Sequence, residues 1–202
     1  MGSLGAQNHR VVESLFGFAF FFIAIAMAMY AASQAGATRE EEARGYADNL
    51  LVRTVSRFHW LAGRVAVAIA GLVALGLAAG FFTWAASTWQ NTGVGLPRLI
   101  EAGLNPVAPA IFILGLGTLV HGLAPRLVPA IAYGVIAWSF LVEMLGSVIR
   151  SPFVVDLSVF HYMALVPAAD IRWDSTAALL GLGLGAALLG AAFFNRRDLA
   201  GQ

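Results

Sequence analysis

The sequence contains no cysteine and no lysine, and only 11% of its 202 residues are charged. Without cysteine, the chain forms no disulfide and has neither a thiolate nucleophile nor a cysteine-ligated metal site. Without lysine, it lacks the phosphate-binding loop that many ATPases build around that residue. A typical soluble domain has roughly 25% charged residues, so this chain has too few charges to cover a water-facing surface. These absences argue against a soluble enzyme.

Apolar residues make up 59% of the chain, and the mean hydropathy is +0.79. They gather in long runs, and a run of about 20 apolar residues is enough for a helix to cross the hydrocarbon core. Five stretches qualify, and they cover residues 15–32, 65–86, 106–123, 129–149 and 176–194. The sequence therefore predicts an all-α membrane protein, a single transmembrane domain over residues 1–202 with about five spans.

The arginines predict the orientation of these spans. The linker between the first two spans, the link between the third and fourth, and the C-terminal tail together carry eight arginines, whereas the opposite side carries four. Arginine is enriched on the cytoplasmic side of membrane proteins, so we expect the N-terminus outside and the C-terminus inside. An odd number of spans with an outside start suggests a further helix, or a whole preceding half, upstream.

The linker at 37–60 combines charge with an amphipathic pattern. Thr38 and Glu41 have the spacing of a capping box, which predicts a helix start. Farther along, Leu51, Val55 and Phe58 recur at helical spacing opposite charged positions. Two interpretations stay open: a helix lying on the membrane surface, or a docking surface for a cytoplasmic partner.

Four motifs resemble those of the type 2 ABC exporter permeases, and the resemblance runs from about Tyr30 to Leu199. The nearest subgroup is the bacterial permeases described as exporters of polyketide antibiotics such as tetronasin, and the chain resembles their C-terminal half. The motifs are Arg39-Glu40-Glu41-Glu42 with Val55-Ser56-Arg57 and Trp60-Leu61-Ala62-Gly63-Arg64; Gly115-Leu116-Gly117 with Gly122-Leu123-Ala124-Pro125-Arg126; Asp156-Leu157-Ser158 with Phe160-His161 and Pro167; and Phe193-Phe194-Asn195-Arg196-Arg197-Asp198.

The resemblance implies a permease in the bacterial plasma membrane that exports hydrophobic compounds, drugs or antibiotics with a second permease half. The permease would not be catalytic and would hold no cofactor or metal, because ATP and Mg²⁺ would bind to a separate ATPase subunit. The linker would form a cytoplasmic coupling helix that docks on this ATPase. The residues expected at that contact are Glu41, Glu42, Asp48, Leu51, Arg53, Val55, Arg57 and Phe58.

Two features lie on the opposite side of the membrane. The outer loop at 150–175 is rich in apolar residues, so we expect a short re-entrant segment that dips into the membrane or caps the pore. Glu143 lies inside the fourth expected span, where a carboxylate is costly and usually faces protein or water. It is a candidate contact for substrate or proton in the transport pathway, or else it pairs with a neighbour near the interface.

Two other functions are compatible with a membrane protein of this composition. One is a haem- or quinone-binding anchor of a redox complex that uses His121 and His161, which would need both histidines at similar depth on facing helices. The other is a membrane scaffold without transport, which would have no ATPase partner. A structural role is the more common one for single histidines in such positions.

Overall fold

The computed structural model describes residues 2–43, 57–90, 92–146 and 151–196, and in these ranges the regular structure is entirely helical. The α-helices and 3₁₀ turns are α1 (Gly2–Ala43), α3 (Arg57–Trp89), α4 (Leu96–Leu104), α5 (Val107–Leu123), η1 (Pro125–Leu127), α6 (Val128–Leu145), α7 (Pro152–Asp156), η2 (Phe160–Tyr162) and α8 (Trp173–Arg196). Five of the described stretches are long and apolar enough to cross a membrane, which confirms the predicted class.

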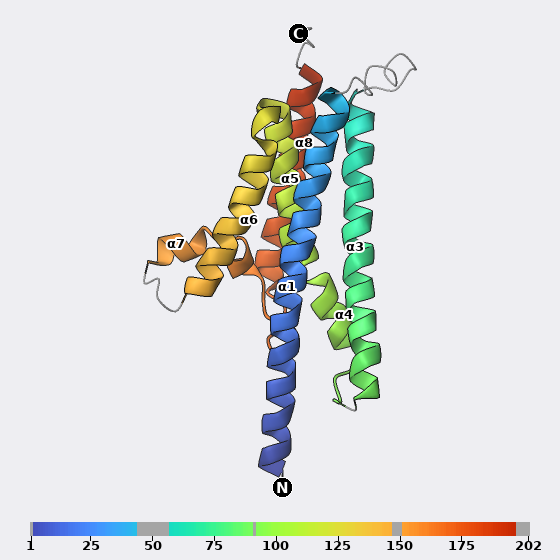
Figure 1. Cartoon of the computed structure of the whole chain (residues 1–202), viewed down its shortest axis with the longest axis vertical. Helices are drawn as coiled ribbons and strands as arrows, with labels where there is room; N and C mark the ends of the chain where they lie inside the picture. Colours follow the sequence, from blue (N-terminus) through green and yellow to red (C-terminus); the bar gives the residue numbers. More distant parts are fainter. Residues whose placement is uncertain (1, 44–56, 91, 147–150, 197–202) are drawn as a thin grey trace.

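Helix α5 forms the centre of the bundle (Figure 1). In the span Leu96–Leu123, which contains α5, 78% of an 18-residue apolar stretch is buried inside the protein. In the other four spans the buried share of the corresponding stretch is 22–44%. Helices α1, α3, α6 and α8 all pack against it. A helix that is apolar on every side suits such a position because it presents no polar face to its neighbours.

Glycines allow the closest helix contacts in the bundle. A Cβ atom added to Gly115 would overlap the backbone carbonyl of Gly183, and one added to Gly122 would overlap that of Gly190. Both pairs join α5 to α8 with the same seven-residue spacing, so the two helices run side by side in parallel. Within a membrane, such small residues stabilise helix pairs because they let the backbones come into van der Waals contact.

The first span is longer than the sequence predicted. Helix α1 has 42 residues, a length of about 63 Å at 1.5 Å per residue, which is about twice the hydrocarbon thickness of about 30 Å. The predicted helix start at Thr38 is wrong. Thr38 lies inside α1, and its Oγ1 donates a hydrogen bond to the Gln34 carbonyl at 2.9 Å. Since no proline interrupts residues 15–43, the helix continues through the capping-box pattern.

The third span contains a break that the sequence prediction missed. Helix α4 precedes α5 and packs along α3, and the two pieces are separated by Asn105 and Pro106. Gly76 of α3 and Gly103 of α4 meet with their backbones in contact. Pro97 lies in the first turn of α4, where its missing N–H removes no helical hydrogen bond.

The outer segment, residues 151–172, folds back against the bundle. Its residues Val159, Phe160, Met163, Ala164 and Val166 are buried, and the Phe160 ring packs edge-on against Phe21 of α1 with centroids 5.7 Å apart. In Figure 1, α7 lies beside the lower half of α6 and not beyond the ends of the helices. Re-entry of this segment into the membrane stays a prediction.

The segments that the arginine pattern assigns to opposite sides of the membrane begin and end at opposite ends of the bundle, and which end is cytoplasmic stays a prediction. The end of α1, the start of α3, η1 and the end of α8 lie at one end, and the end of α3 and the outer segment lie at the other (Figure 1).

We therefore expect single cysteines at Ala43 and Gln202 to be protected from a membrane-impermeant thiol reagent in intact cells, while a cysteine at Asn91 reacts. The natural absence of cysteine makes each introduced thiol the only target. Permeabilised cells, in which all three should react, provide the control. Labelling at residue 43 from outside would contradict both the orientation and the assignment of the linker to the cytoplasm.

Candidate functional site

Those of the expected ATPase-docking residues that the structure describes lie at the end of the bundle that the arginines assign to the cytoplasm. Glu41 and Glu42 belong to the last turn of α1 and Arg57 is the first residue of α3, so the edges of the predicted 37–60 loop are helical extensions of these two spans. Asp48, Leu51, Arg53 and Val55 lie outside the described residues. Their docking role stays a prediction.

Phe58, the last of the docking residues, is 39% exposed on the first turn of α3. It lines an apolar groove of about 300 Å³ between α3 and α8, together with residues that include Leu61, Val65, Leu184 and Leu188. A displacement of the first turn of α3 therefore changes the packing of α3 against α8.

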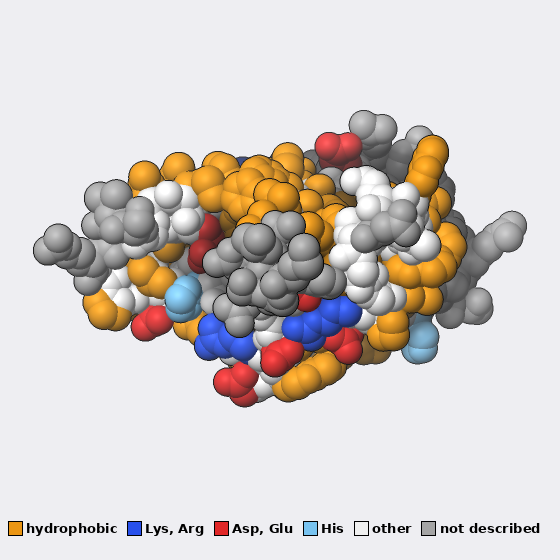
Figure 2. Space-filling view, turned by 90° about the horizontal axis from the view of Figure 1, so that it is seen from below, with side chains coloured by type: hydrophobic (Ala, Val, Ile, Leu, Met, Phe, Trp, Pro, Cys, Tyr) orange, Lys and Arg blue, Asp and Glu red, His pale blue; other side chains and the backbone are white. Residues whose placement is uncertain are grey.

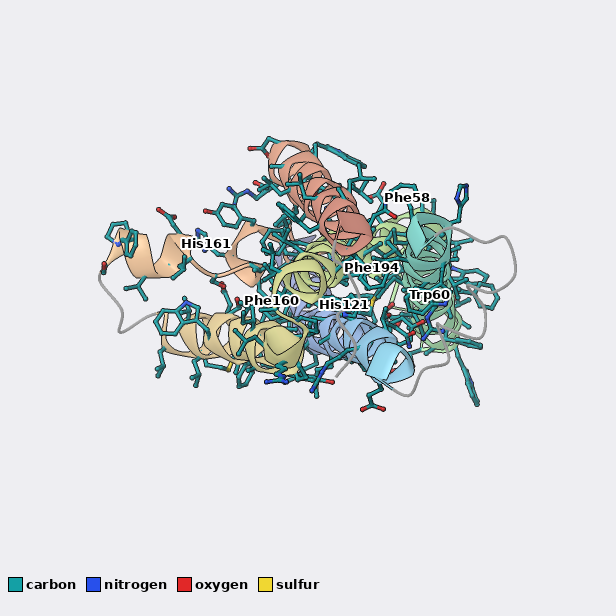
Figure 3. The ribbon with its side chains drawn as sticks, turned by 90° about the horizontal axis from the view of Figure 1, so that it is seen from above. Phe58, Trp60, His121, Phe160, His161 and Phe194 are labelled. Atoms are coloured by element: carbon teal, nitrogen blue, oxygen red, sulfur yellow. The ribbon has the colours of Figure 1, made fainter. Side chains whose placement is uncertain are left out.

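An aromatic stack connects this region to the central helix. The Trp60 ring lies 6.1 Å from that of Phe194, and the Phe194 ring lies 5.3 Å from the imidazole of His121. Figure 3 shows the three side chains at the meeting point of α3, α8 and α5. His121 is only 1% exposed, so it serves here as a packed residue of the helix interface.

On the other side of α5, two hollows flank the side chain of Phe112. The first, of about 470 Å³, lies against α6 and is lined by Gly134, Val135 and Trp138 among others. The second, of about 370 Å³, lies against α8, where Leu179 and Leu182 line it. Both are closed on the outer side by the same residues of the outer segment, which are Leu157 and Val159. Volumes of this size and apolar character suit small hydrophobic ligands.

Glu143 lies at the junction of α6 and the outer segment. Its Oε1 accepts a hydrogen bond from the Ser158 hydroxyl at 3.0 Å, and the Ser158 Oγ accepts one from the backbone N–H of His161 at 3.2 Å. One turn earlier on α6, the Ser139 Oγ accepts the Val159 N–H at 3.0 Å. Glu143 thus has the neighbouring partner that the sequence analysis considered, and a role in the substrate pathway stays a prediction.

A second polar contact fastens α4 to the outer segment. The Arg98 guanidinium donates to the carbonyls of Pro167 and Ala169 at 3.0–3.3 Å and to Asp170 Oδ1 at 2.8 Å, and it also pairs with Glu101 at 3.2 Å. Nearby, the buried Asn105 Nδ2 donates to the Ala164 carbonyl at 2.6 Å.

Viewed from the outer end of the bundle, acidic and arginine side chains gather on a surface that is otherwise mostly apolar (Figure 2). Sequence reasoning did not identify the contacts of Arg98, Asn105, Ser139 and Ser158, because their partners are distant in sequence. The one available signal was a polar or charged residue at the end of an apolar run.

The two histidines do not form a shared site. His121 lies in the last turn of α5, whereas His161 belongs to η2 at the opposite end of the bundle, and the two labels are well separated in Figure 3. Among the described residues, no three histidine or acidic side chains are grouped so that they could hold a metal ion. A haem bridged by this pair is therefore incompatible with the fold.

Comparison with known proteins identifies the family. Residues 1–195 match the family described as the C-terminal domain of the multidrug efflux system permease Rv1217c. The chain is 32% identical over 209 aligned positions to the multidrug efflux system permease protein Rv1217c of Mycobacterium tuberculosis. The alignment covers 98% of the chain and 36% of that relative, so the chain spans about a third of the relative's length. The five apolar helices and the match over almost every residue place the chain in the family of multidrug efflux permease C-terminal domains.

Proposed function

We propose that this chain is part of the membrane subunit of an ATP-driven exporter of hydrophobic compounds in the bacterial plasma membrane. The observation that carries the proposal is the match to an efflux permease domain over residues 1–195. The hollows beside Phe112 support it, because they offer apolar binding volume. A closeness to tetronasin-type exporters in particular is part of the proposal and rests on the sequence motifs alone.

In this proposal the chain binds and guides substrate, and a separate ATPase binds ATP and Mg²⁺. The chain itself holds no cofactor. The linker between α1 and α3 docks on the ATPase, and its motion reaches the bundle through the first turn of α3. The aromatic stack of Trp60, Phe194 and His121 would pass that motion on to α8 and α5, because packed side chains transmit displacement better than they absorb it. A second permease half completes the route.

The test is drug accumulation in cells that lack their own major efflux pumps. Cells that produce the permease with the ATPase encoded beside it should accumulate less of a hydrophobic dye than cells that produce either component alone. An ATPase variant that binds but does not hydrolyse ATP should restore accumulation. If the complete system leaves accumulation unchanged at normal membrane levels, or if no ATPase is encoded beside the permease, a scaffold without transport becomes the better account.

A further inference from the structure

The hollow against α8 differs from its neighbour in its polar lining. Its floor is apolar, with Phe112 of α5 and Leu179 of α8, while the residues Asp156, Ser158, Tyr162 and Ser175 also line it. The Tyr162 hydroxyl donates to the backbone carbonyl of Asp156 at 2.9 Å. This hydrogen bond links the two ends of the segment 156–162. We refer to this hollow as the Asp156 pocket.

The Asp156 pocket has one charged side chain in its described lining, and that side chain is negative. Asp156 is exposed and is the one acidic residue among the described residues of the lining, which include no arginine or histidine. A second carboxylate, that of Glu143, lies one hydrogen bond behind Ser158. A positive charge in the pocket would therefore meet one carboxylate at the rim and a second just behind the wall.

The arginines described at this end of the bundle are already engaged elsewhere. Arg98 binds the carbonyls of Pro167 and Ala169 and the carboxylates of Glu101 and Asp170. The Arg172 Nη1 donates to the His161 carbonyl at 3.3 Å, and Arg172 does not line the pocket. Neither arginine forms an ion pair with Asp156 or Glu143 among the described contacts.

We propose that the Asp156 pocket is a binding site for lipophilic cations, with the aromatic and aliphatic floor holding the apolar body and Asp156 facing the positive charge. This inference rests on the proposed export function, and it narrows the substrate class of that function. Phe112 and Tyr162 add to it because a cation is attracted to the face of an aromatic ring. A lipid acyl chain would fit the floor but would leave the carboxylate without a counter-charge, and an organic anion would be repelled.

The test measures binding directly, without ATP or transport. The full chain is placed in nanodiscs of phosphatidylcholine, whose zero net charge does not concentrate cations at the surface. The dissociation constant is measured for tetraphenylphosphonium and, in parallel, for the neutral triphenylphosphine oxide. We expect Asp156→Asn to weaken tetraphenylphosphonium binding about tenfold at low salt, since a partly exposed charge pair at close range has an energy of that order. Binding of the neutral compound should be unchanged.

Two variants serve as comparisons. Asp170→Asn removes the same charge at the same end of the bundle, but that side chain is 94% exposed and pairs with Arg98 away from the pocket, so it should leave both dissociation constants unchanged. Glu143→Gln keeps an oxygen that can accept from Ser158 and should weaken cation binding by a smaller factor, about twofold to threefold, because it is more distant. Asp156→Asn should fold normally, because the hydrogen bond from Tyr162 goes to the backbone of residue 156.

Equal binding of tetraphenylphosphonium to wild type and Asp156→Asn would overturn the proposal, as would the absence of saturable binding or an equal loss for the neutral compound. These results are separable from a failure of the export function. A pocket that binds the cation in a system that does not lower drug accumulation would contradict only the transporter. Normal export of neutral dyes by a protein without this binding would contradict only the pocket.

Discussion

Replacing Gly115 by alanine should destabilise the bundle by about 3 kcal/mol, the upper part of the range for overpacking a dense interior. The added methyl group would fall 2.6 Å from the carbonyl carbon of Gly183 and closer still to its oxygen. Both atoms belong to the backbone of a packed helix, so neither can rotate away as a side chain would. The α5–α8 pair can accept the methyl group only if the two helices move apart along their seam.

The measurement is thermal unfolding of the purified protein in detergent, followed by tryptophan fluorescence or by loss of the monodisperse peak in size-exclusion chromatography. For a protein of this size we expect the midpoint to fall by about 6–12 °C. The matched control is Gly181→Ala on the partner helix α8, where a Cβ atom would meet no atom within 4 Å. Alanine has the better helix propensity by about 1 kcal/mol, so this control should be neutral or slightly stabilising. Equal midpoints for the two variants would contradict the close seam.

The double substitution Leu51→Asp and Val55→Asp should abolish binding of the ATPase while the permease still inserts. Both positions belong to the apolar side of the predicted coupling helix, and a buried unpaired charge costs several kcal/mol at such a contact. Co-purification of the ATPase with tagged permease from detergent-solubilised membranes measures the effect. Membrane levels of the permease, determined in the same samples, show whether insertion is preserved.

The control for this experiment adds the same two charges to the other side of the predicted helix. Asn49 and Ser56 are displaced from Leu51 and Val55 by about 100–160° around the helix axis, so Asn49→Asp with Ser56→Asp should retain the ATPase. Retention of the ATPase by the Leu51 and Val55 variant would remove the support for docking through this face. Loss in both double variants would point to a general effect of charge on the linker.

The spans were predictable because a membrane imposes a simple requirement. A run of about 20 apolar residues has few alternatives in a chain with so little charge. Four of the five predicted runs lie within described apolar helices, and the remaining one, 129–149, extends past the end of its helix at Leu145. The boundaries were harder to predict. The error at Thr38 arose because the capping-box pattern also occurs inside a helix, where the threonine hydroxyl bonds to a carbonyl of the preceding turn, here that of Gln34.

The polar contacts of the outer segment could not be predicted, because they join residues far apart in sequence. Glu143 was recognised as unusual from its position alone, yet its partner Ser158 is fifteen residues away, beyond the end of α6. The break between α4 and α5 was missed for a related reason. Pro106 starts an apolar run that is long enough to span by itself, so nothing in the pattern required a separate helix before it.

The attachment of α4 to the outer segment determines which parts of the molecule can move together. Arg98 and Asn105 hold residues 164–170 from one side, while Ser139 and Glu143 hold residues 158–159 from α6. The outer segment thus connects α4, which packs along α3, to α6. A conformational change that moves α4 and α6 apart at the outer end has to break the contacts on one side of the outer segment. The segment then moves with the helix to which it is still bonded. Each side has one buried hydrogen bond, from Asn105 to Ala164 on the α4 side and from Val159 to Ser139 on the α6 side. The contacts of Arg98 with Asp170 and of Glu143 with Ser158 lie nearer to water. On either side, the buried bond is therefore the one that costs most to break.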